Sequence, residues 1–321
     1  MARLKLLAAA ALLLSASPAD ARLFPDSPFS DQAVGTTAAQ FLKTPPSARA
    51  DALGGAFVSA AEGAEALFWN PAGAASLETT LRSDLSAGYD ALLETAYLGS
   101  VAYARPVPGV GVLSAGFLYS SQSGQQGYDG VGDPAEPFTP NDLAFAFGYA
   151  KQLDRIHLGA AAKLVRSQVA GASGMTFALD LGVQRLAAVN TTEGPIDLGL
   201  AIQNLGPAMS IGNGSDPLPL RFQLGARWHL SERIAGLLDG FLPVDDSPYV
   251  ALGLEGRFPL GERLRASARG GYNISRSRGI DGLTGMAGGF GIEFLSYRLD
   301  YAWVPFGDLG STNRVTFGIA F

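Results

Sequence analysis

The sequence predicts an all-β protein, a transmembrane antiparallel β-barrel of about 14 strands with an N-terminal helical plug in its lumen. Three observations carry this prediction. Long stretches alternate apolar and polar residues, long and short connections alternate along the chain, and one segment near the N-terminus lacks the alternation. No charged or low-complexity linker divides the chain, so we expect one barrel domain.

The first residues follow the pattern of an exported protein. Arg3 and Lys5 precede an unbroken apolar run over residues 6–14, and a small-x-small pattern follows at 19–21. This order predicts a secretory signal peptide over residues 1–21. The apolar run is far shorter than the roughly 20 residues that a spanning helix needs. We therefore expect Sec-type export.

Residues 22–79 are predicted to form an N-terminal arm and the helical plug. The prolines at 45–46 can open a helix, and Asn70, Pro71 and Ala72 end the helical stretch, because a residue before proline is disfavoured in the α region. The many small residues between these points indicate a compact element that packs inside another structure.

Residues 80–321 are predicted to form the outer-membrane barrel. In one clear strand Phe177, Leu179, Leu181 and Val183 share a face, and each such face has the length of a membrane-crossing strand. The expected strands lie near residues 81–90, 93–106, 109–120, 142–152, 155–169, 175–187, 195–205, 219–230, 233–243, 248–259, 262–275, 283–295, 297–305 and 312–321.

The connections separate a membrane barrel from a soluble sandwich, which would also alternate. Outer-membrane barrels have short periplasmic turns and longer outer loops. The predicted turns lie at 107–108, 153–154, 188–194, 231–232, 260–261 and 296, and the predicted outer loops include 121–141, 206–218, 276–282 and 306–311. Two connections depart from this alternation of short turns and long loops: the turn at 188–194 is too long, and the loop at 90–92 is too short.

The last strand and the aromatic residues point to the same membrane. Phe317, Ile319 and Phe321 share a face, and they resemble the C-terminal signal by which outer-membrane barrels reach their assembly machinery. We therefore expect the bacterial outer membrane, with its lipid and lipopolysaccharide as surroundings. Aromatic residues near strand ends predict an interfacial girdle of Trp228, Tyr249, Tyr272, Tyr297, Tyr301 and Trp303.

The inward faces indicate what fills the lumen. Several strands place only small residues inward, for example Ala144, Ala146 and Gly148 on one strand and Ser114 and Gly116 on another. Small residues permit another element to approach closely, whereas an open porin would carry rings of charge. The segment over residues 35–77 therefore fits inside the barrel as a plug.

A set of charged residues is predicted to form an inward wall. One interpretation is ion pairing across the lumen and to the plug, because buried charges must be paired. The other is recognition of a carboxylate or a peptide terminus, and the sequence leaves both open. The residues are Asp180, Arg221, Arg227, Glu255, Arg257, Arg263, Arg265 and Arg269.

Signals for catalysis or cofactors are weak. His157 and His229 have no neighbours in a catalytic or metal-binding spacing, and we interpret them as strand-end polar residues. Asp129, Asp133 and Glu136 share one loop, but their spacing departs from a regular calcium loop. We expect no enzyme activity, no catalytic residue, no metal and no cofactor. The net charge of −6 without basic clusters argues against nucleic-acid binding.

Several short motifs suggest a family. The plug carries FLK at 41–43, SARA at 47–50, LGGA at 53–56 and FWNPAG at 68–73; later motifs are DLG at 180–182, IQNLG at 202–206, DYA at 300–302, FG at 306–307 and LG at 309–310. This pattern resembles the PorV/PorQ family of outer-membrane barrels, which are akin to the FadL long-chain fatty acid transporters. The resemblance covers nearly the whole mature chain.

The resemblance implies two functions. PorV-type proteins serve type IX secretion and bind or shuttle exported protein, so secretion-system components or cargo are the expected partners. A FadL-like alternative is a plug-gated transporter of fatty acids or other hydrophobic molecules. The plug and the terminal strands are more similar to PorV/PorQ, although only the loop at 121–141 is long enough to suggest a cargo surface.

Overall fold

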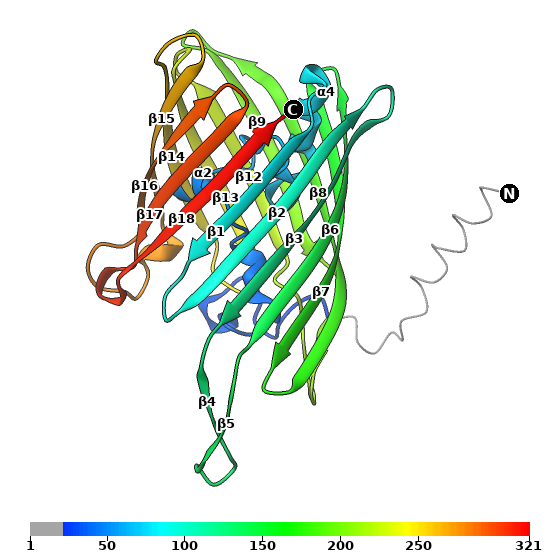
Figure 1. The fold of residues 1–321 in the computed structure, drawn as a ribbon, viewed down its shortest axis with the longest axis vertical. Helices are drawn as coiled ribbons and strands as arrows, with labels where there is room; N and C mark the ends of the chain where they lie inside the picture. The colour runs from blue at the N-terminus through cyan, green and yellow to red at the C-terminus, as the bar shows by residue number, and fades with distance from the viewer. Residues whose placement is uncertain (1–21) are drawn as a thin grey trace, which may run out of the picture.

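The computed structural model describes residues 22–321, so the predicted signal peptide lies outside the described residues. Fourteen strands form one closed antiparallel barrel, which confirms the predicted fold class (Figure 1). Strands β1 and β18 close the ring, with Asp84 opposite Ala320. No helix among residues 22–321 has the length and apolar character needed to cross a membrane.

The barrel strands follow one another around the wall in sequence order. They are β1 (Asp84–Ala91), β2 (Ala96–Val107), β3 (Gly111–Gln122), β6 (Asn141–Leu153), β7 (Ile156–Val169), β8 (Ala172–Asn190), β9 (Pro195–Leu205), β12 (Arg221–His229), β13 (Ile234–Pro243), β14 (Tyr249–Pro259), β15 (Leu264–Asn273), β16 (Met286–Phe294), β17 (Tyr297–Pro305) and β18 (Ser311–Ala320).

The two ends of the barrel differ in their connections. At the turn end, where the C-terminus lies in Figure 1, the connections are short: 108–110, 154–155, 191–194, 230–233, 260–263 and 295–296. At the loop end they include 123–140, 206–220, 244–248, 274–285 and 306–310. The predicted over-long turn at 188–194 is shorter in the structure, because β8 continues to Asn190.

Two small hairpins at the loop end were not predicted. Strands β4 (Gln125–Tyr128) and β5 (Pro134–Phe138) form a hairpin that projects beyond the barrel (Figure 1). Strands β10 (Met209–Ile211) and β11 (Gly214–Asp216) form the other, in which Met209 is buried. The short turns η4 (Ser275–Ser277) and η5 (Gly307–Leu309) shape two further loops.

The barrel reverses the usual distribution of polar and apolar residues. Leu179, Leu181 and Phe290 are exposed on the outside of the wall, whereas Asp180 and Glu255 are buried inside. A contiguous apolar outer surface around a polar lumen is the arrangement of a lipid-embedded barrel. The apolar face of each alternating strand therefore points outward to lipid and not inward to an apolar core.

The plug is built from several short helical turns. These are η1 (Asp31–Ala33), η2 (Gln40–Lys43), α2 (Ala48–Ala52), α3 (Ala66–Trp69), η3 (Pro71–Ser76) and α4 (Leu77–Thr80). The expected continuous helix from the prolines at 45–46 onward is wrong. Gly54, Gly55 and Gly63 all have positive φ angles, of 69°, 90° and 66°, and they interrupt the helix after its first turns.

The chain crosses the lumen from one end to the other. The amide of Phe29 donates to the carbonyl of Val244 at 3.1 Å, and the amide of Ala38 donates to Pro217 at 2.9 Å, so residues 22–43, the N-terminal arm, lie at the loop end. The chain then passes through the barrel and enters β1 at the turn end (Figure 1). The plug is therefore held at both ends.

The aromatic girdle is only partly as predicted. Trp228, Tyr272 and Trp303 are exposed on the outer surface. Tyr249 instead faces the lumen, where its ring stacks on Phe241 with 4.6 Å between centroids. Its position at the start of β14 makes it resemble a girdle residue, although its parity places it inward.

Candidate functional site: the plug and the lumen wall

Inward glycines bring the wall into direct contact with the plug. A Cβ atom on Gly159 would lie 2.3 Å from the amide nitrogen of Ala72, and one on Gly182 would lie 2.0 Å from Oδ1 of Asn70. Neither distance is possible for a real side chain, so these positions require glycine. Cβ atoms at six other wall glycines would lie 2.1–2.9 Å from plug atoms, and one at Gly253 would lie 3.1 Å from Leu53; the six are Gly88, Gly116, Gly148, Gly199, Gly271 and Gly289.

The Asn70-Pro71-Ala72 motif holds two parts of the plug together. Oδ1 of Asn70 accepts a hydrogen bond from the amide of Ala72 at 3.2 Å and caps η3, while Pro71 occupies the first turn. Nδ2 of Asn70 donates to the carbonyl of Val58 at 2.8 Å. The side chain is fully buried, and both Oδ1 and Nδ2 make their hydrogen bonds inside the lumen.

Amide side chains of the wall satisfy the irregular backbone of the plug. Gln184 on β8 donates to the carbonyls of Val58 and Ala61, both at 3.0 Å. Gln203 on β9 donates to the carbonyls at 68–69, at 2.8 and 2.9 Å. Backbone groups away from water need such partners, and the plug has little secondary structure to supply them.

Asp239 on β13 provides the matching acceptor. Its Oδ2 accepts from the amides of Phe57 and Val58, at 2.7 and 2.8 Å, and from Nε2 of Gln223 at 2.9 Å. The carboxylate is completely buried. The wall therefore binds the middle of the plug through both donors and an acceptor.

Glu255 on β14 is the centre of the main charge cluster. Its carboxylate accepts from Nε of Arg49 at 2.8 Å, from Nε of Arg269 at 2.9 Å and from Nε of Arg257 at 3.1 Å. Nη2 of Arg227 lies 3.5 Å away. Four guanidinium groups thus surround one buried carboxylate, and one of them, Arg49, comes from the plug.

Two further carboxylates complete this cluster. Nη1 of Arg49 lies 2.5 Å from Oε1 of Glu62, and Nη1 of Arg269 lies 2.5 Å from Oδ1 of Asp300. Burial alone would lower the pKa of Arg49, but Glu255 and Glu62 raise it well above its usual value. The enclosed position of Glu62 inside the barrel opposes its ionisation, although its side chain is 44% exposed, yet Arg49 and Arg257 hold its pKa below the usual range. The plug is therefore charged where it meets β14.

The structure brings together only part of the predicted charged wall. Arg227, Arg257 and Arg269 meet at Glu255, as described. Asp180 instead pairs with Lys163, with 2.6 Å between Nζ and Oδ2. Arg221 donates from Nε to Gln203 at 3.1 Å and from Nη1 to the carbonyl of Lys43 at 3.0 Å. These residues lie on other strands of the ring.

Arg265 and Arg263 lie at the turn end. Nη1 of Arg265 pairs with Oε2 of Glu293 at 3.1 Å, and 57% of its side chain is exposed. The inward placement of Arg263 is wrong. This residue is exposed in the turn that precedes β15, because the strand begins only at Leu264 and its parity does not extend into the turn.

A second cluster was missed by the sequence analysis. Asp51 on α2 pairs with Nη2 of Arg276 at 3.0 Å and with Arg314, which also lies 3.5 Å from Asp90. Arg49 and Glu62 were missed as well. Their signal was available, because an arginine or glutamate in a small, apolar segment destined for a lumen requires a partner.

The remaining predicted polar residues have structural positions. His157 is buried, and Nε2 of His229 lies 2.7 Å from Asp197. Oδ1 of Asp129 accepts from the amides of Val131 and Asp133, both at 2.9 Å, and closes the tip of the β4–β5 hairpin. Among residues 22–321, His, Asp and Glu side chains form no group of three suited to a metal ion.

At the loop end, Asp245 holds the N-terminal arm. Its carboxylate accepts from Oγ1 of Thr37 at 2.6 Å, from Gln40 at 3.0 Å and from Nζ of Lys43 at 3.1 Å. Burial alone would raise the pKa of Asp245, but the Lys43 ammonium and these hydrogen bonds lower it below its usual value. This one carboxylate therefore binds three side chains of the arm, in addition to the backbone hydrogen bonds at Phe29 and Ala38.

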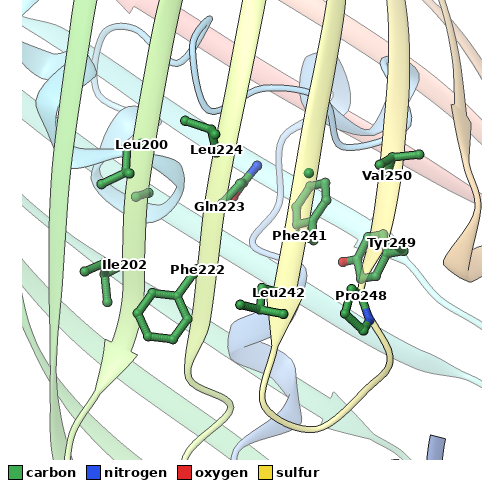
Figure 2. Close-up of a pocket in the computed structure, with 12 residues that line it drawn as sticks. Leu200, Ile202, Phe222, Gln223, Leu224, Phe241, Leu242, Pro248, Tyr249 and Val250 are labelled. Carbon is green, nitrogen blue, oxygen red and sulfur yellow. The ribbon is translucent and has the colours of Figure 1, made fainter. Parts of the chain in front are cut away.

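An apolar groove of about 510 Å³ crosses the outside of β9, β12, β13 and β14 (Figure 2). Exposed Leu200, Leu224 and Leu242 line it. The ladder beneath is continuous, with Gly240 opposite Val250 and then Phe241 opposite Tyr249. The groove lies on the lipid-facing surface, and its lining also includes Gln223, Phe241 and Tyr249, whose side chains face inward.

A polar cavity of about 440 Å³, the turn-end vestibule, lies between the plug and the strands β14 to β18. Its floor is formed by Arg49 and Arg269 of the Glu255 cluster. Other residues of its lining are Glu62, Arg82, Arg257, Arg265, Glu293 and Arg298.

Comparison with known proteins places these features in context. A family model described as "Type IX secretion system protein PorV" matches residues 27–232. No curated protein matches the chain.

Solved structures share the fold at low sequence identity. The Pseudomonas putida toluene transporter TodX is 14% identical with a TM-score of 0.53, over 86% of this chain and 97% of that one. The Ralstonia pickettii toluene transporter TbuX is 14% identical with a TM-score of 0.52, over 84% and 96%. A Pseudomonas aeruginosa FadL homologue is 11% identical with a TM-score of 0.47, over 86% and 97%.

Proposed function

Because the chain belongs to the family of the type IX secretion system protein PorV, we propose that it is a secretion-associated outer-membrane factor that binds or shuttles exported protein. Its short turns then face the periplasm and its loops face the outside, as in other outer-membrane barrels. The relationship predicted from the plug motifs is confirmed by the family match. The role in secretion follows from that membership.

The observation that supports a binding role most strongly is the closed and filled lumen. The strand ladder is continuous around the ring. Inside it the plug is bound to the wall through Glu255, Asp239 and Gln184. A protein in this state offers its surfaces to a partner and offers no open path through its centre. We therefore place the contact with exported protein at the loop end.

The β4–β5 hairpin is the loop-end element best suited to that contact. It projects beyond the barrel (Figure 1), and the side chains of Tyr128 and Val131 are 66% and 85% exposed. Aromatic residues are enriched in protein interfaces because they bury a large area with few rotatable bonds. An exposed tyrosine at the tip of an extended hairpin fits this pattern.

Site-specific photocrosslinking tests this placement. A photoreactive residue replaces Tyr128 in one strain and Val131 in another, and a matched control replaces Leu260, which is 63% exposed in a turn at the opposite end. We expect adducts with exported proteins or secretion components at the first two positions and not at the third. Equal adducts at all three positions, or none, would contradict the placement.

Affinity purification from native membranes tests the role itself. We expect secretion-machine components or exported proteins to co-purify with the tagged barrel. Replacement of residues 123–140 by a two-residue Asn-Gly turn should remove the exported proteins while leaving a folded barrel, because this loop lies outside the strand ladder. Recovery of lipid alone, without any of these proteins, would contradict the proposal.

Transport of hydrophobic molecules is a second candidate, favoured by one observation. Two solved structures that share this fold over most of their length are named as toluene transporters. Transport would require the plug to move, since it fills the lumen in this structure. Uptake of labelled toluene or oleate by cells that carry the barrel, compared with cells that lack it, distinguishes this function.

The supporting parts of the proposal concern export and assembly. We propose that residues 1–21 direct Sec-type export, that 22–79 act as arm and plug, and that 80–321 insert into outer-membrane lipid beside lipopolysaccharide. Phe317, Ile319 and Phe321 serve as the signal to the barrel assembly machinery. Phe317 and Phe321 are exposed, which suits recognition of the unfolded strand and later contact with lipid. We propose no enzymatic step.

A further inference from the structure

We propose that the turn-end vestibule is a binding site for a small anion that carries carboxylate or phosphate groups and enters from the side of the short turns. The site is separate from the loop-end contact proposed above. Its volume of about 440 Å³ falls within the range of about 300–1,000 Å³ typical of ligand pockets.

The accessible part of the vestibule wall has more positive than negative groups. Four arginines reach solvent there, and the carboxylates that reach it belong to Glu62 and Glu293, whose side chains are 44% and 30% exposed. The arginines are Arg82, Arg257, Arg265 and Arg298. The excess of guanidinium groups makes the mouth of the cavity attractive to anions.

The deeper arginines do not contribute to this excess. Arg49 and Arg269 are bound to Glu255, and their other ends meet Glu62 and Asp300. These ion pairs fix the floor of the cavity. A ligand that enters from the turn end therefore meets a rigid polar floor and a rim of arginines, each of which has only some of its N–H donors in hydrogen bonds.

Arg265 and Arg298 retain donors for a ligand. A guanidinium group has five N–H donors in a planar fork that fits a carboxylate or a phosphate. Among the described residues, Arg265 pairs through Nη1 with Glu293, and Arg298 donates through Nη2 to Asp84 at 3.2 and 3.4 Å. The remaining N–H groups of both side chains are free to bind an anion.

Arg82 is held at the rim in a suitable position. Its Nη2 donates to Oγ of Ser296 at 2.6 Å and also to the carbonyl of Ala320. These contacts tie the side chain across the β1–β18 seam and leave its other nitrogens for a ligand. Glu65 also lines the cavity, where its carboxylate accepts a hydrogen bond from Oγ of Ser47 at 2.8 Å.

Titration calorimetry on the full mature protein in detergent tests the site, with citrate as the carboxylate probe and pyrophosphate as the phosphate probe. We expect binding of at least one probe at low ionic strength and weaker binding as salt is added. The double variant Arg82→Gln, Arg265→Gln should weaken it by about tenfold or more, because two charge-assisted contacts are lost. Binding of one probe only identifies the anion class.

Two further variants make the test specific. Glu293→Gln should strengthen binding, since it releases Arg265 from its competitor, and a merely structural role of this pair would not produce that gain. Arg155→Gln removes an exposed arginine from another turn at the same end and should leave the affinity unchanged.

The proposal is overturned if neither probe binds the wild-type protein, if Arg155→Gln weakens binding as much as the double variant, or if Glu293→Gln weakens it. Failure of the secretion role would appear instead as missing adducts at Tyr128, so the two proposals are tested independently.

Discussion

Arg49 of the plug and Glu255 of β14 form a two-point contact inside the barrel, with Nε 2.8 Å from Oε1 and Nη2 3.1 Å from Oε2. Both side chains are almost completely buried. A bidentate pair of this kind fixes orientation as well as distance. It ties the first helix of the plug to one strand and sets its height in the lumen.

Glu255→Gln should detach the plug. The substitution leaves four guanidinium groups without their shared carboxylate, and breaking a buried pair on one side costs about 3–5 kcal/mol. Urea unfolding in lipid vesicles measures the loss through the fluorescence of Trp69, which lies in the plug edge-on to Phe57, in a background in which Trp228 and Trp303 are replaced by phenylalanine. The control Glu293→Gln breaks an exposed pair and should cost less than about 1 kcal/mol. Similar losses for the two variants would contradict the central place of Glu255.

Gly182→Ala should displace the Asn70 turn. The added methyl group would lie 2.0 Å from Oδ1 of Asn70, and overpacking of this kind costs about 1–3 kcal/mol. Limited proteolysis of the plug and the temperature of the gel-mobility shift both report the change. Gly240→Ala is the matched control, since its nearest neighbour is a carbonyl 3.9 Å away. If Gly240→Ala proves equally harmful, the effect comes from the strand and not from contact with the plug.

Asn70→Asp should be more harmful than Asn70→Ala. Both variants lose the hydrogen bond from Nδ2 to Val58, but the aspartate also brings a buried negative charge to a carbonyl oxygen. The loss for alanine should be about 1–3 kcal/mol, and aspartate should exceed it even though it retains the capping oxygen. Unfolding monitored at Trp69 ranks the variants, and the reverse ranking would show that the cap matters more than the donor.

Acid should release the N-terminal arm. The folded pKa of Asp245 is lowered, so its contribution to stability is complete above the unfolded pKa of about 3.9 and is lost as pH falls through the lower folded pKa. The chain has no cysteine, so Val34→Cys provides a unique site for a spin label. The label should become mobile only below about pH 4, and Asp245→Asn should make it mobile at neutral pH. A label that stays immobile at neutral pH in Asp245→Asn would contradict the role of Asp245.

The strands could be predicted because their signal is local. Alternation such as that from Thr176 to Val183 depends on neighbouring residues and one lipid boundary, and it fixes which side chains face inward. At Arg263 the alternation fails because the strand has not yet begun. Arg263 was assigned to the lumen by extending the pattern of Arg265 and Arg269 backwards, but the turn begins before it and removes the constraint.

The pairing inside the lumen could not be predicted from the strands. Asp180 on β8 and Glu255 on β14 both point inward, yet three strands separate them around the ring. Which arginine meets which carboxylate depends on the height and rotation of the plug. These follow from contacts such as Gly182 with Asn70, and sequence parity contains no information about them.

The plug itself was recognised by its composition and misjudged in its shape. Alanine-rich sequence around residues 48–66 favours helix, but Gly54, Gly55 and Gly63 adopt left-handed angles there. The wall supplies the hydrogen bonds that a longer helix would have made internally, through Gln184 and Asp239. Hydrogen bonds from the wall thus outweigh the helix propensity of the alanine-rich segment.

The path of the chain from the loop end to the turn end limits how the barrel can ever open. A plug anchored at one end could swing aside, whereas this plug is attached at both ends, to β1 at the turn end and to Val244 and Asp245 at the loop end. A pull on the β1 end of the plug alone leaves the N-terminal arm bound to Val244 and Asp245. Movement of the plug out of the lumen toward the turn end therefore requires release of the arm at the loop end.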